Sequence, residues 1–222
     1  MTKQVVIHDH PPVNFEWTTA CLNDLVQFYP DSAATNLGAI STWWWNFGDG
    51  GTSNNPIGSH AYIAPGTYTV SLTVTDTLGC DSTVFHDIEI HALPVAHFDP
   101  GNNNCSGAIV QFTDHSSTSW GYITRWIWDY DDGTVDTVYH PANPNVTHVY
   151  ALPGTYNVKL SILASDSCTA FETQAVTIHP NPIANFFYNP IACEGTPLQF
   201  TDLSQPNGGG SLTMWNWNFG DP

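Results

Sequence analysis

The sequence predicts an all-β protein built from tandem two-sheet antiparallel β-sandwiches, the last of them truncated. An aromatic turn motif recurs at residues 43–50, 126–133 and 215–222. Apolar and polar residues alternate at 68–75 and 156–163, which is the period-two pattern of strands with one buried face. Clusters of Pro, Gly, Asn, Asp and Ser separate these stretches, as expected for turns between strands.

The repeat extends beyond the aromatic motif and has a period of 83 and then 89 residues, counted from Asp49 to Asp132 to Asp221. Solenoid repeats are usually shorter, roughly 20–50 residues, so each repeat here is long enough to be a small domain. A cysteine precedes a phenylalanine by seven residues in each copy. These pairs are Cys21 and Phe28, Cys105 and Phe112, and Cys193 and Phe200.

The repeat sets the expected domain boundaries. Two complete sandwiches are predicted at 9–92 and 93–180, and the first half of a third at 181–222. Residues 1–8 resemble the end of the second repeat, so we expect them to be the last strand of a preceding repeat.

The individual strands follow in order within each repeat. Short apolar segments at 25–28, 110–112 and 198–200 are predicted strands of one sheet. The long alternating segments at 68–75 and 156–163 are predicted strands of the other. Alternate residues of the aromatic motif share one strand face: Trp43, Trp45 and Phe47 in the first repeat, and Trp126, Trp128 and Tyr130 in the second.

Composition excludes several classes of function. The chain has 20 acidic and 3 basic residues, giving a net charge of -17. Binding to nucleic acid or to anionic membranes depends on Lys and Arg, so neither is expected. No apolar run approaches the ~20 residues of a membrane-spanning helix. A hydrophobic content of 41% is enough for packed cores.

The five cysteines are distributed by the repeat. Each complete repeat has two, which predicts the disulfides Cys21–Cys80 and Cys105–Cys168. The partner of Cys193 is then expected beyond residue 222. One pair per small domain is typical of an oxidising, extracellular environment. Metal binding is the alternative, but no Cys-x-x-Cys spacing supports it.

Four motifs in a fixed order resemble the PKD (polycystic kidney disease) domain family. They are Trp-x-Phe-Gly-Asp-Gly, His-x-Tyr, Pro-Gly-Thr-Tyr and Val-x-Leu-x-Val, and they cover residues 12–222. The resemblance implies immunoglobulin-like β-sandwiches. The Gly79-Cys80 pair also resembles PKD arrays of large bacterial surface proteins exported by the type IX secretion system. Asp131 stands where the family has Gly, but Asp adopts left-handed backbone more readily than most residues.

The Asp-Gly pairs of the aromatic motif have two interpretations. As structural turns, Asp49 and Asp132 would accept backbone N–H bonds, while Gly50 and Gly133 supply a positive φ. As chemistry, the carboxylates would be catalytic or metal-binding. Turn chemistry accounts for both residue types, so we favour the structural interpretation. No catalytic residue and no cofactor are predicted.

Carboxylates cluster near the second copy of the motif, at Asp129, Asp131, Asp132 and Asp136. Calcium prefers such oxygen ligands, so these residues are weak calcium candidates. The first repeat has Asn46 and Gly48 in place of two of them, which favours a solvated acidic edge instead.

Short Asp-Ser/Thr triplets resemble the O-glycosylation acceptor of bacteria that carry such PKD arrays. They make Ser32, Thr77, Ser82 and Thr137 candidate glycosylation sites.

Three functions remain open from the sequence. The first is a non-enzymatic extracellular stalk, fibre or adhesin shaft at a bacterial surface, joined end to end to neighbouring repeats or subunits of the same protein. The second is an accessory region of a secreted hydrolase that engages surface glycans or matrix proteins, for which Trp44 and Trp120 are candidate contacts. The third is a ligand-binding adhesion ectodomain.

Overall fold

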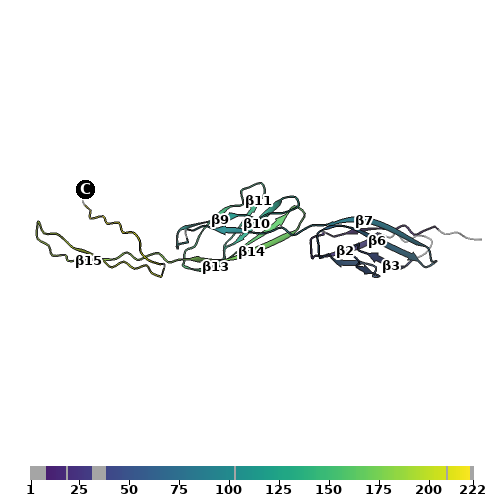
Figure 1. The fold of residues 1–222 in the computed structure, drawn as a ribbon, viewed down its shortest axis with the longest axis horizontal. Helices are drawn as coiled ribbons and strands as arrows, with labels where there is room; N and C mark the ends of the chain where they lie inside the picture. The colour runs from purple at the N-terminus through teal and green to yellow at the C-terminus, as the bar shows by residue number, and fades with distance from the viewer. Residues whose placement is uncertain (1–8, 19, 32–38, 103, 209, 221–222) are drawn as a thin grey trace, which may run out of the picture. The chain divides into compact units, whose positions relative to one another are not determined.

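A computed structural model describes the chain except for residues 1–8, 19, 32–38, 103, 209 and 221–222. The described residues form strands, turns and loops, which confirms the all-β fold class (Figure 1). No described helix has the length and hydrophobicity needed to cross a membrane. The predicted strand at residues 1–8 and the candidate glycosylation site Ser32 lie outside the described residues.

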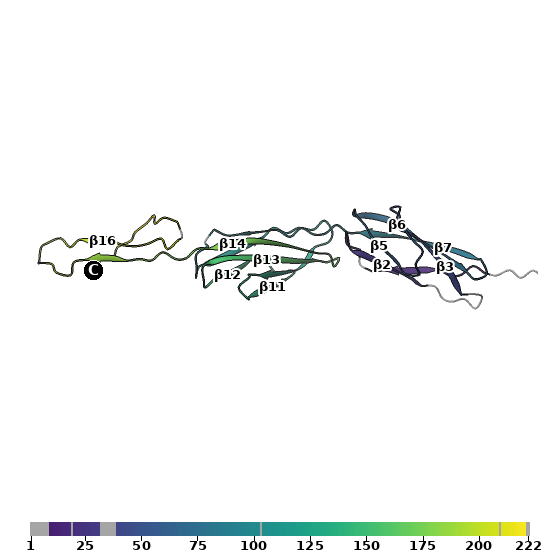
Figure 2. The ribbon, with the colours of Figure 1, turned by 90° about the horizontal axis from the view of Figure 1, so that it is seen from below.

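The first repeat folds into two antiparallel sheets. In the smaller sheet the strand order is β1-β2-β5, and in the larger it is β4-β3-β6-β7. Both views show β3, β6 and β7 side by side (Figures 1 and 2). The strands are β1 (Asn14–Trp17), β2 (Leu25–Asp31), β3 (Ile40–Asn46), β4 (Thr52–Ser53), β5 (Gly58–Ala61), β6 (Gly66–Asp76) and β7 (Asp81–Ile90).

The alternation along the long strands creates the core of the first repeat. Val70, Leu72 and Val74 of β6 are fully buried, as are Trp45 of β3 and Phe28 of β2. Burying one large apolar side chain stabilises a fold by roughly 1.5–3 kcal/mol. The core of the first repeat therefore forms from the apolar residues that alternate with polar ones along these strands.

The second repeat has the same two sheets, with strand orders β12-β9-β8 and β11-β10-β13-β14. Its buried residues occupy the same positions of the repeat, with Trp128, Phe112, Val158 and Leu160 in the interior. The strands are β8 (Phe98–Pro100), β9 (Ile109–Asp114), β10 (Ile123–Asp129), β11 (Val135–Tyr139), β12 (Val146–Val149), β13 (Gly154–Ala164) and β14 (Thr169–Ile178).

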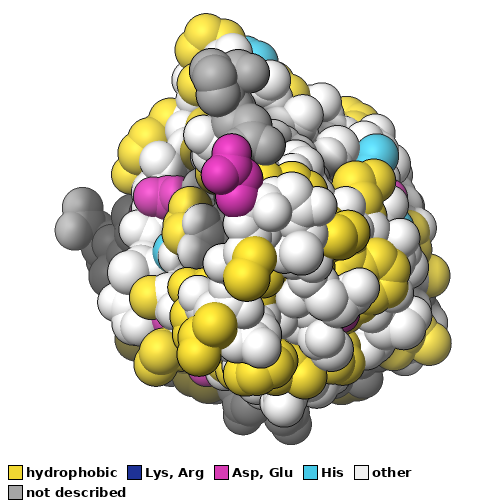
Figure 3. Space-filling model, turned by 90° about the vertical axis from the view of Figure 1, so that its left-hand side faces the viewer, with side chains coloured by type: hydrophobic (Ala, Val, Ile, Leu, Met, Phe, Trp, Pro, Cys, Tyr) yellow, Lys and Arg dark blue, Asp and Glu magenta, His cyan; other side chains and the backbone are white. Residues whose placement is uncertain are grey.

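The C-terminal segment contains one two-stranded sheet, formed by β15 (Phe186–Tyr188) and β16 (Phe200–Asp202). Its aromatic motif residues are partly exposed: Trp217 is 37% exposed, whereas its equivalent Trp128 is fully buried. Figure 3 shows hydrophobic side chains spread over one face of the molecule.

Contacts divide the chain into two compact units that differ from the predicted domains. The first unit runs to Val95 and also contains Ser117–Thr124 and Ile162–Ala170. The second contains Ala96–Ser116, Arg125–Ser161 and the residues from Phe171 onward. Both cysteines of the observed disulfide, Cys21 and Cys168, thus belong to the first unit.

The predicted disulfides are wrong. Cys21 is bonded to Cys168, with a Cα–Cα distance of 5.7 Å, and Cys80, Cys105 and Cys193 are free. The backbone of Cys21 forms an isolated β-bridge with His91, which follows the last residue of β7. Cys80 immediately precedes the first residue of the same strand.

The length of β7 is the reason for this error. A strand of 10 residues spans about 30 Å at ~3.3 Å per residue, and a disulfide tolerates a Cα–Cα distance of only about 7 Å. The same argument applies to the second repeat. Cys168 immediately precedes β14, whereas Cys105 forms a β-bridge with His179, which follows the last residue of that strand.

Candidate binding surface

The repeated motifs form one stacked aromatic cluster in the first repeat. The ring of His60 lies flat on that of Phe47, with centroids 4.6 Å apart, and meets Tyr62 edge-on at 4.7 Å. Tyr62 in turn packs against Tyr68 at 4.3 Å, and its hydroxyl donates to the Phe47 carbonyl at 3.0 Å. His60 Nε2 lies 2.7 Å from Asp49 Oδ2. The His-x-Tyr and Gly-Asp motifs are therefore two sides of one cluster.

The second repeat builds the same cluster from equivalent residues. His148 lies flat on Tyr130 at 4.0 Å and meets Tyr150 edge-on at 4.6 Å. Tyr150 packs against Tyr156 at 4.2 Å. His148 Nε2 is 2.7 Å from Asp132 Oδ2. The two copies have matching distances, as expected where each cluster is packed inside its own sandwich.

Electrostatics favour the ionised carboxylate of the aspartate in each cluster. Burial would raise the pKa of Asp49, but hydrogen bonds from His60 and the Gly51 N–H hold it below its ordinary value. Asp132 has a lowered pKa for similar reasons: burial opposes the shift, and hydrogen bonds from Thr134 and His148 outweigh it. Burial raises the pKa of the Tyr62 hydroxyl, which therefore stays protonated and donates its hydrogen bond.

The turns after the aromatic strands have the geometry of Asx turns. Asp49 Oδ1 accepts the N–H of Gly51 at 2.9 Å, and Gly50 has a φ of 96°. In the second repeat Thr134 N–H donates to Asp132 Oδ1 at 3.1 Å, and Gly133 has a φ of 90°.

The position that departs from the family pattern is accommodated by a new contact. A Cβ on Gly48 would lie 2.7 Å from the Thr69 carbonyl oxygen, so the first repeat requires glycine there. Asp131 occupies this position in the second repeat with a φ of 62°. Its Oδ2 accepts the N–H of Asn157 at 2.8 Å, which anchors the side chain.

The four calcium candidates are engaged by donors of the protein itself. Asp136 Oδ2 accepts the Tyr130 hydroxyl at 2.8 Å, and Asp129 Oδ1 accepts the Asp131 N–H at 3.1 Å. Asp131 and Asp132 accept the bonds from Asn157, Thr134 and His148 given above.

A different group brings three possible metal ligands together among the described residues. It consists of His91, Asp166 and Cys168, whose ligand atoms lie within 4.8 Å of one another. The Cys168 sulfur is already bonded to Cys21. His91 Nδ1 lies 3.0 Å from Asp166 Oδ2, and Trp120 stacks on the His91 ring at 4.7 Å. With the Cys168 sulfur bonded to Cys21, the group leaves two ligand residues, His91 and Asp166, for a metal.

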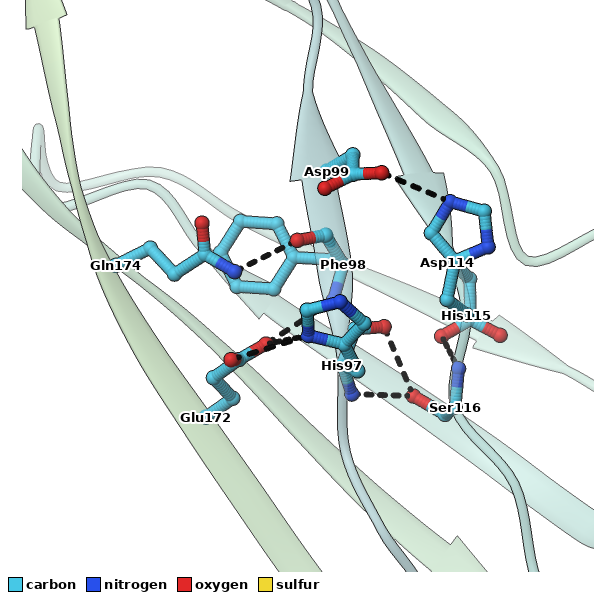
Figure 4. A network of polar contacts seen from close by, with 8 residues as sticks. All are labelled: His97, Phe98, Asp99, Asp114, His115, Ser116, Glu172 and Gln174. Carbon is cyan, nitrogen blue, oxygen red and sulfur yellow. Dashed lines mark hydrogen bonds and ion pairs between the residues drawn. The ribbon is translucent and has the colours of Figure 1, made fainter.

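Polar side chains hold the first strand of the second repeat against β14 (Figure 4). Glu172 Oε2 accepts the Phe98 N–H at 3.0 Å and lies 3.2 Å from His97 Nδ1. Gln174 Nε2 donates to the Phe98 carbonyl at 2.6 Å. Burial opposes a lower pKa for Glu172, but hydrogen bonds involving Gln174 and His97 outweigh it.

Two large aromatic side chains are exposed on the outward side of β3, β6 and β7 in the first repeat. Trp44 is 53% exposed and Phe85 is 64% exposed there. Trp44 pairs in register with Thr73 of β6, which pairs with Thr83 of β7. The two threonine hydroxyl oxygens are 2.8 Å apart. We call these residues, together with Ser71 opposite Phe85, the Trp44 face.

The structure adds one residue to this surface and separates another from it. Phe85 was missed by the sequence analysis, although it is in phase with the polar residues Thr83 and Asp87 of β7. That phase was the available signal for an outward aromatic residue. Trp120, predicted together with Trp44, is 46% exposed but lies against His91 instead.

The described glycosylation candidates differ in exposure. Thr77 lies in the exposed turn between β6 and β7, and Thr137 is exposed on β11. Ser82 on β7 is half-buried, so it is the least accessible of the three.

The C-terminal segment contains a cavity of about 740 Å³. Its lining includes Phe186, Phe200, Trp217 and Phe219. These positions of the repeat are buried core residues in the second repeat, where Phe98, Phe112, Trp128 and Tyr130 occupy them. The cavity is therefore lined by core positions of a sandwich and is not assigned as a ligand site.

Two complete copies of one sandwich, each with its own aromatic cluster, define a tandem β-sandwich protein. The PKD domain model matches residues 9–90 and 91–178, and the chain belongs to the PKD domain family. A PKD domain is a non-catalytic module. The earlier expectation of tandem PKD domains is confirmed.

Two curated relatives are bacterial collagenases. Collagenase ColA of Bacillus cereus is 43% identical over 61 residues, which cover 28% of this chain and 6% of the relative. A microbial collagenase of Vibrio alginolyticus is 36% identical over 72 residues, covering 32% of this chain and 9% of the relative. The chain thus spans less than a tenth of the length of either relative.

Solved structures of single PKD domains are also similar to parts of the chain. The PKD1 domain of Vibrio anguillarum Epp is 34% identical, with a TM-score of 0.35. The aligned region covers 37% of this chain and 94% of that domain. The PKD1 domain of the Vibrio cholerae metalloprotease PrtV is 32% identical, with a TM-score of 0.34. The aligned region covers 37% of this chain and 98% of that domain.

Proposed function

We propose that the chain is a non-catalytic extracellular segment that holds a secreted hydrolase on a fibrous protein substrate of the collagen type. The Trp44 face carries this proposal. The similarity of the chain to segments of two collagenases supports the substrate class. Among the three functions left open by the sequence, these relatives favour the accessory region of a secreted enzyme.

The chemistry of the Trp44 face suits a long polymer better than a small molecule. The face is one side of a sheet, and an extended surface of this kind suits a polymer, whereas compact ligands are usually bound in concave pockets. Trp44 on β3 and Phe85 on β7 supply large apolar contact areas, and Ser71 and Thr73 lie on β6 between these two strands, with Thr83 beside Phe85 on β7. Exposed aromatic residues of this kind contribute much of the binding energy at protein interfaces.

Co-sedimentation with insoluble collagen fibrils tests the proposal. The chain should sediment with the fibrils, and Trp44→Ala should weaken binding by about 5–30-fold, equal to roughly 1–2 kcal/mol. Ile127→Ala is the matched control, because Ile127 occupies the position of Trp44 in the second repeat; this variant should bind normally. A chain that stays in solution, or a Trp44→Ala variant that binds like wild type, refutes the assignment.

A second function is a stalk or adhesin shaft, and one observation favours it. The disulfide Cys21–Cys168 joins the first family match to the second, so it would resist separation of the repeats under tension. Export by the type IX system and O-glycans on Thr77, Ser82 or Thr137 belong to this proposal. Small-angle scattering should then show an elongated particle, and the intact mass of native material should exceed 24.3 kDa. A compact particle contradicts a shaft.

A further inference from the structure

Cys21 and Cys105 occupy the same position in their repeats, and we call them the loop cysteines. The backbone of Cys21 forms an isolated parallel β-bridge with His91, and the backbone of Cys105 forms one with His179. The residue after each cysteine donates its N–H to that histidine carbonyl at 2.9 Å: Leu22 in the first loop and Ser106 in the second. The backbone therefore presents the Cys105 side chain in the way that it presents that of Cys21.

Cys80 lies between β6 and β7, and Cys168 lies between β13 and β14. We call them the hairpin cysteines, and their surroundings also match. Cys80 accepts a bond from the Asp76 N–H at 2.9 Å, and Cys168 accepts one from the Ala164 N–H at 2.9 Å. The residue before each cysteine is left-handed, with a φ of 85° at Gly79 and 71° at Ser167. Each repeat thus has one loop cysteine and one hairpin cysteine in a fixed backbone geometry.

Exposure separates the bonded members from the free ones. Cys21 is 3% exposed and Cys168 is 1% exposed, whereas Cys105 is exposed and Cys80 is half-buried. The hairpin tip that contains the free Cys80 also carries Leu78, which is 51% exposed. The free Cys80 thiol therefore lies beside an exposed part of this turn.

The histidines beside the loop cysteines differ in the same direction. His91, beside the bonded Cys21, is covered by Trp120 and Asp166. His179, beside the free Cys105, is exposed. Among the described residues, the free loop therefore resembles the bonded loop in its backbone and differs from it in that no hairpin cysteine is bonded to its cysteine.

We propose that Cys105 and Cys80 are the two halves of a repeat-to-repeat disulfide of the Cys21–Cys168 kind, each made with another PKD repeat. Cys105 takes the hairpin cysteine of one repeat, and Cys80 takes the loop cysteine of another. Because the observed bond joins a loop cysteine to a hairpin cysteine, the rule excludes loop–loop and hairpin–hairpin pairs. Within one repeat the two cysteines stand at opposite ends of a long strand, so the partner must come from a different repeat.

Oxidised glutathione is a sufficient oxidant for the bond. The Cys105 thiolate attacks the glutathione disulfide and releases one glutathione thiolate, leaving a mixed disulfide. The thiolate of the hairpin cysteine then displaces the second glutathione. The two protein thiols lose two protons and two electrons in total, and one glutathione disulfide becomes two thiols.

Two variants of the full chain test the rule with a second copy as the partner. One keeps Cys105 but carries Cys80→Ser and Cys193→Ser, and the other keeps Cys80 but carries Cys105→Ser and Cys193→Ser. The two chains have tags of different mass and are mixed in equal amounts in a glutathione redox buffer. Mass spectrometry then counts mixed and like dimers, and peptide mapping checks that Cys21–Cys168 is intact.

Random pairing of two equal pools yields as many mixed dimers as both kinds of like dimers together, and the same mixture in denaturant provides this reference. In the folded mixture we expect the ratio of mixed to like dimers to rise about tenfold, equal to roughly 1.4 kcal/mol of specific contact. A ratio equal to or below that of the denatured mixture, or a folded mixture without dimers, overturns the proposal.

Discussion

The first and second repeats share their interiors and differ on their outward faces. Both contain the stacked ring of an aromatic residue on a histidine, with centroids 4.6 Å apart in the first and 4.0 Å apart in the second. Outside, Trp44 of the first repeat is replaced by Ile127, and Phe85 by Thr173. Packing restricts interior positions to a few side chains, whereas an outward position is free to change. Function that differs between repeats should therefore be sought on the outward faces.

The largest effect should come from the shared interior. Trp45 and Trp128 are both fully buried at the same position of the repeat. Replacing either one with alanine should lower the stability of its own repeat by about 3–5 kcal/mol, because a large cavity is left behind. Hydrogen exchange, read separately on β6–β7 and β13–β14, gives the two values.

Trp217→Ala is the internal control for this comparison. Trp217 has the same place in the motif but is 37% exposed, so its removal should cost far less. Unequal costs for Trp45 and Trp128, by more than about 2 kcal/mol, would show that the two interiors are not equivalent.

The next effect should distinguish the hairpin cysteines. Cys168→Ser removes a disulfide that closes a sequence separation of 147 residues, which costs about 4–5 kcal/mol in the chain-entropy model. Cys80→Ser changes a free thiol and should alter stability by no more than about 0.5 kcal/mol. Thermal melts of both variants, with and without reductant, measure the difference. Reductant should affect wild type and Cys80→Ser equally and leave Cys168→Ser unchanged.

The disulfides show what the repeat pattern could and could not predict. Equal offsets identify equivalent cysteines, but they do not tell which of them are neighbours in space. The predicted pairs placed Cys21 with Cys80, although β7 separates the two ends at which they lie. Counting residues along that strand would have excluded the pair, because its 10 residues are far longer than a disulfide. The correct partner depended on contacts between repeats, for which the sequence has no local signal.

The strands and the aromatic surface were predictable to different degrees. The alternation at 68–75 and 156–163 anticipated β6 and β13, because burial on one side imposes a period of two. The same rule placed Trp44 on the opposite face from Trp45. Phe85 was missed because an exposed aromatic residue in a polar phase breaks the pattern used to find strands.

A smaller effect should follow from acidification. The pKa of Asp49 is lower in the folded protein than the ordinary value of 3.8, so its carboxylate stabilises the first repeat above that pH. The contribution is lost as the pH falls through the lower, folded pKa. Asp49→Asn should therefore flatten the loss of stability below about pH 4. Denaturant melts at a series of acidic pH values measure this slope.

Asp132→Asn provides the matching measurement in the second repeat, where the pKa of Asp132 is lowered as well. The two variants should act alike, since each carboxylate faces one histidine at 2.7 Å. If only one variant changes the loss of stability at acidic pH, the electrostatic equivalence of the two clusters is disproved.

The smallest effect should come from an outward contact that only the second repeat has. Lys159 Nζ lies 4.5 Å from the centroid of the exposed Phe171 ring. At an exposed site such a cation–π contact contributes about 0.5–1 kcal/mol. Lys159→Met keeps the aliphatic stem and removes the charge, so it should destabilise the second repeat by at most that amount. A double-mutant cycle with Phe171→Leu isolates the coupling in thermal melts. A coupling above about 2 kcal/mol would mean that the outward faces contribute to the fold as the interior does, and the division between conserved interiors and variable faces would then be wrong.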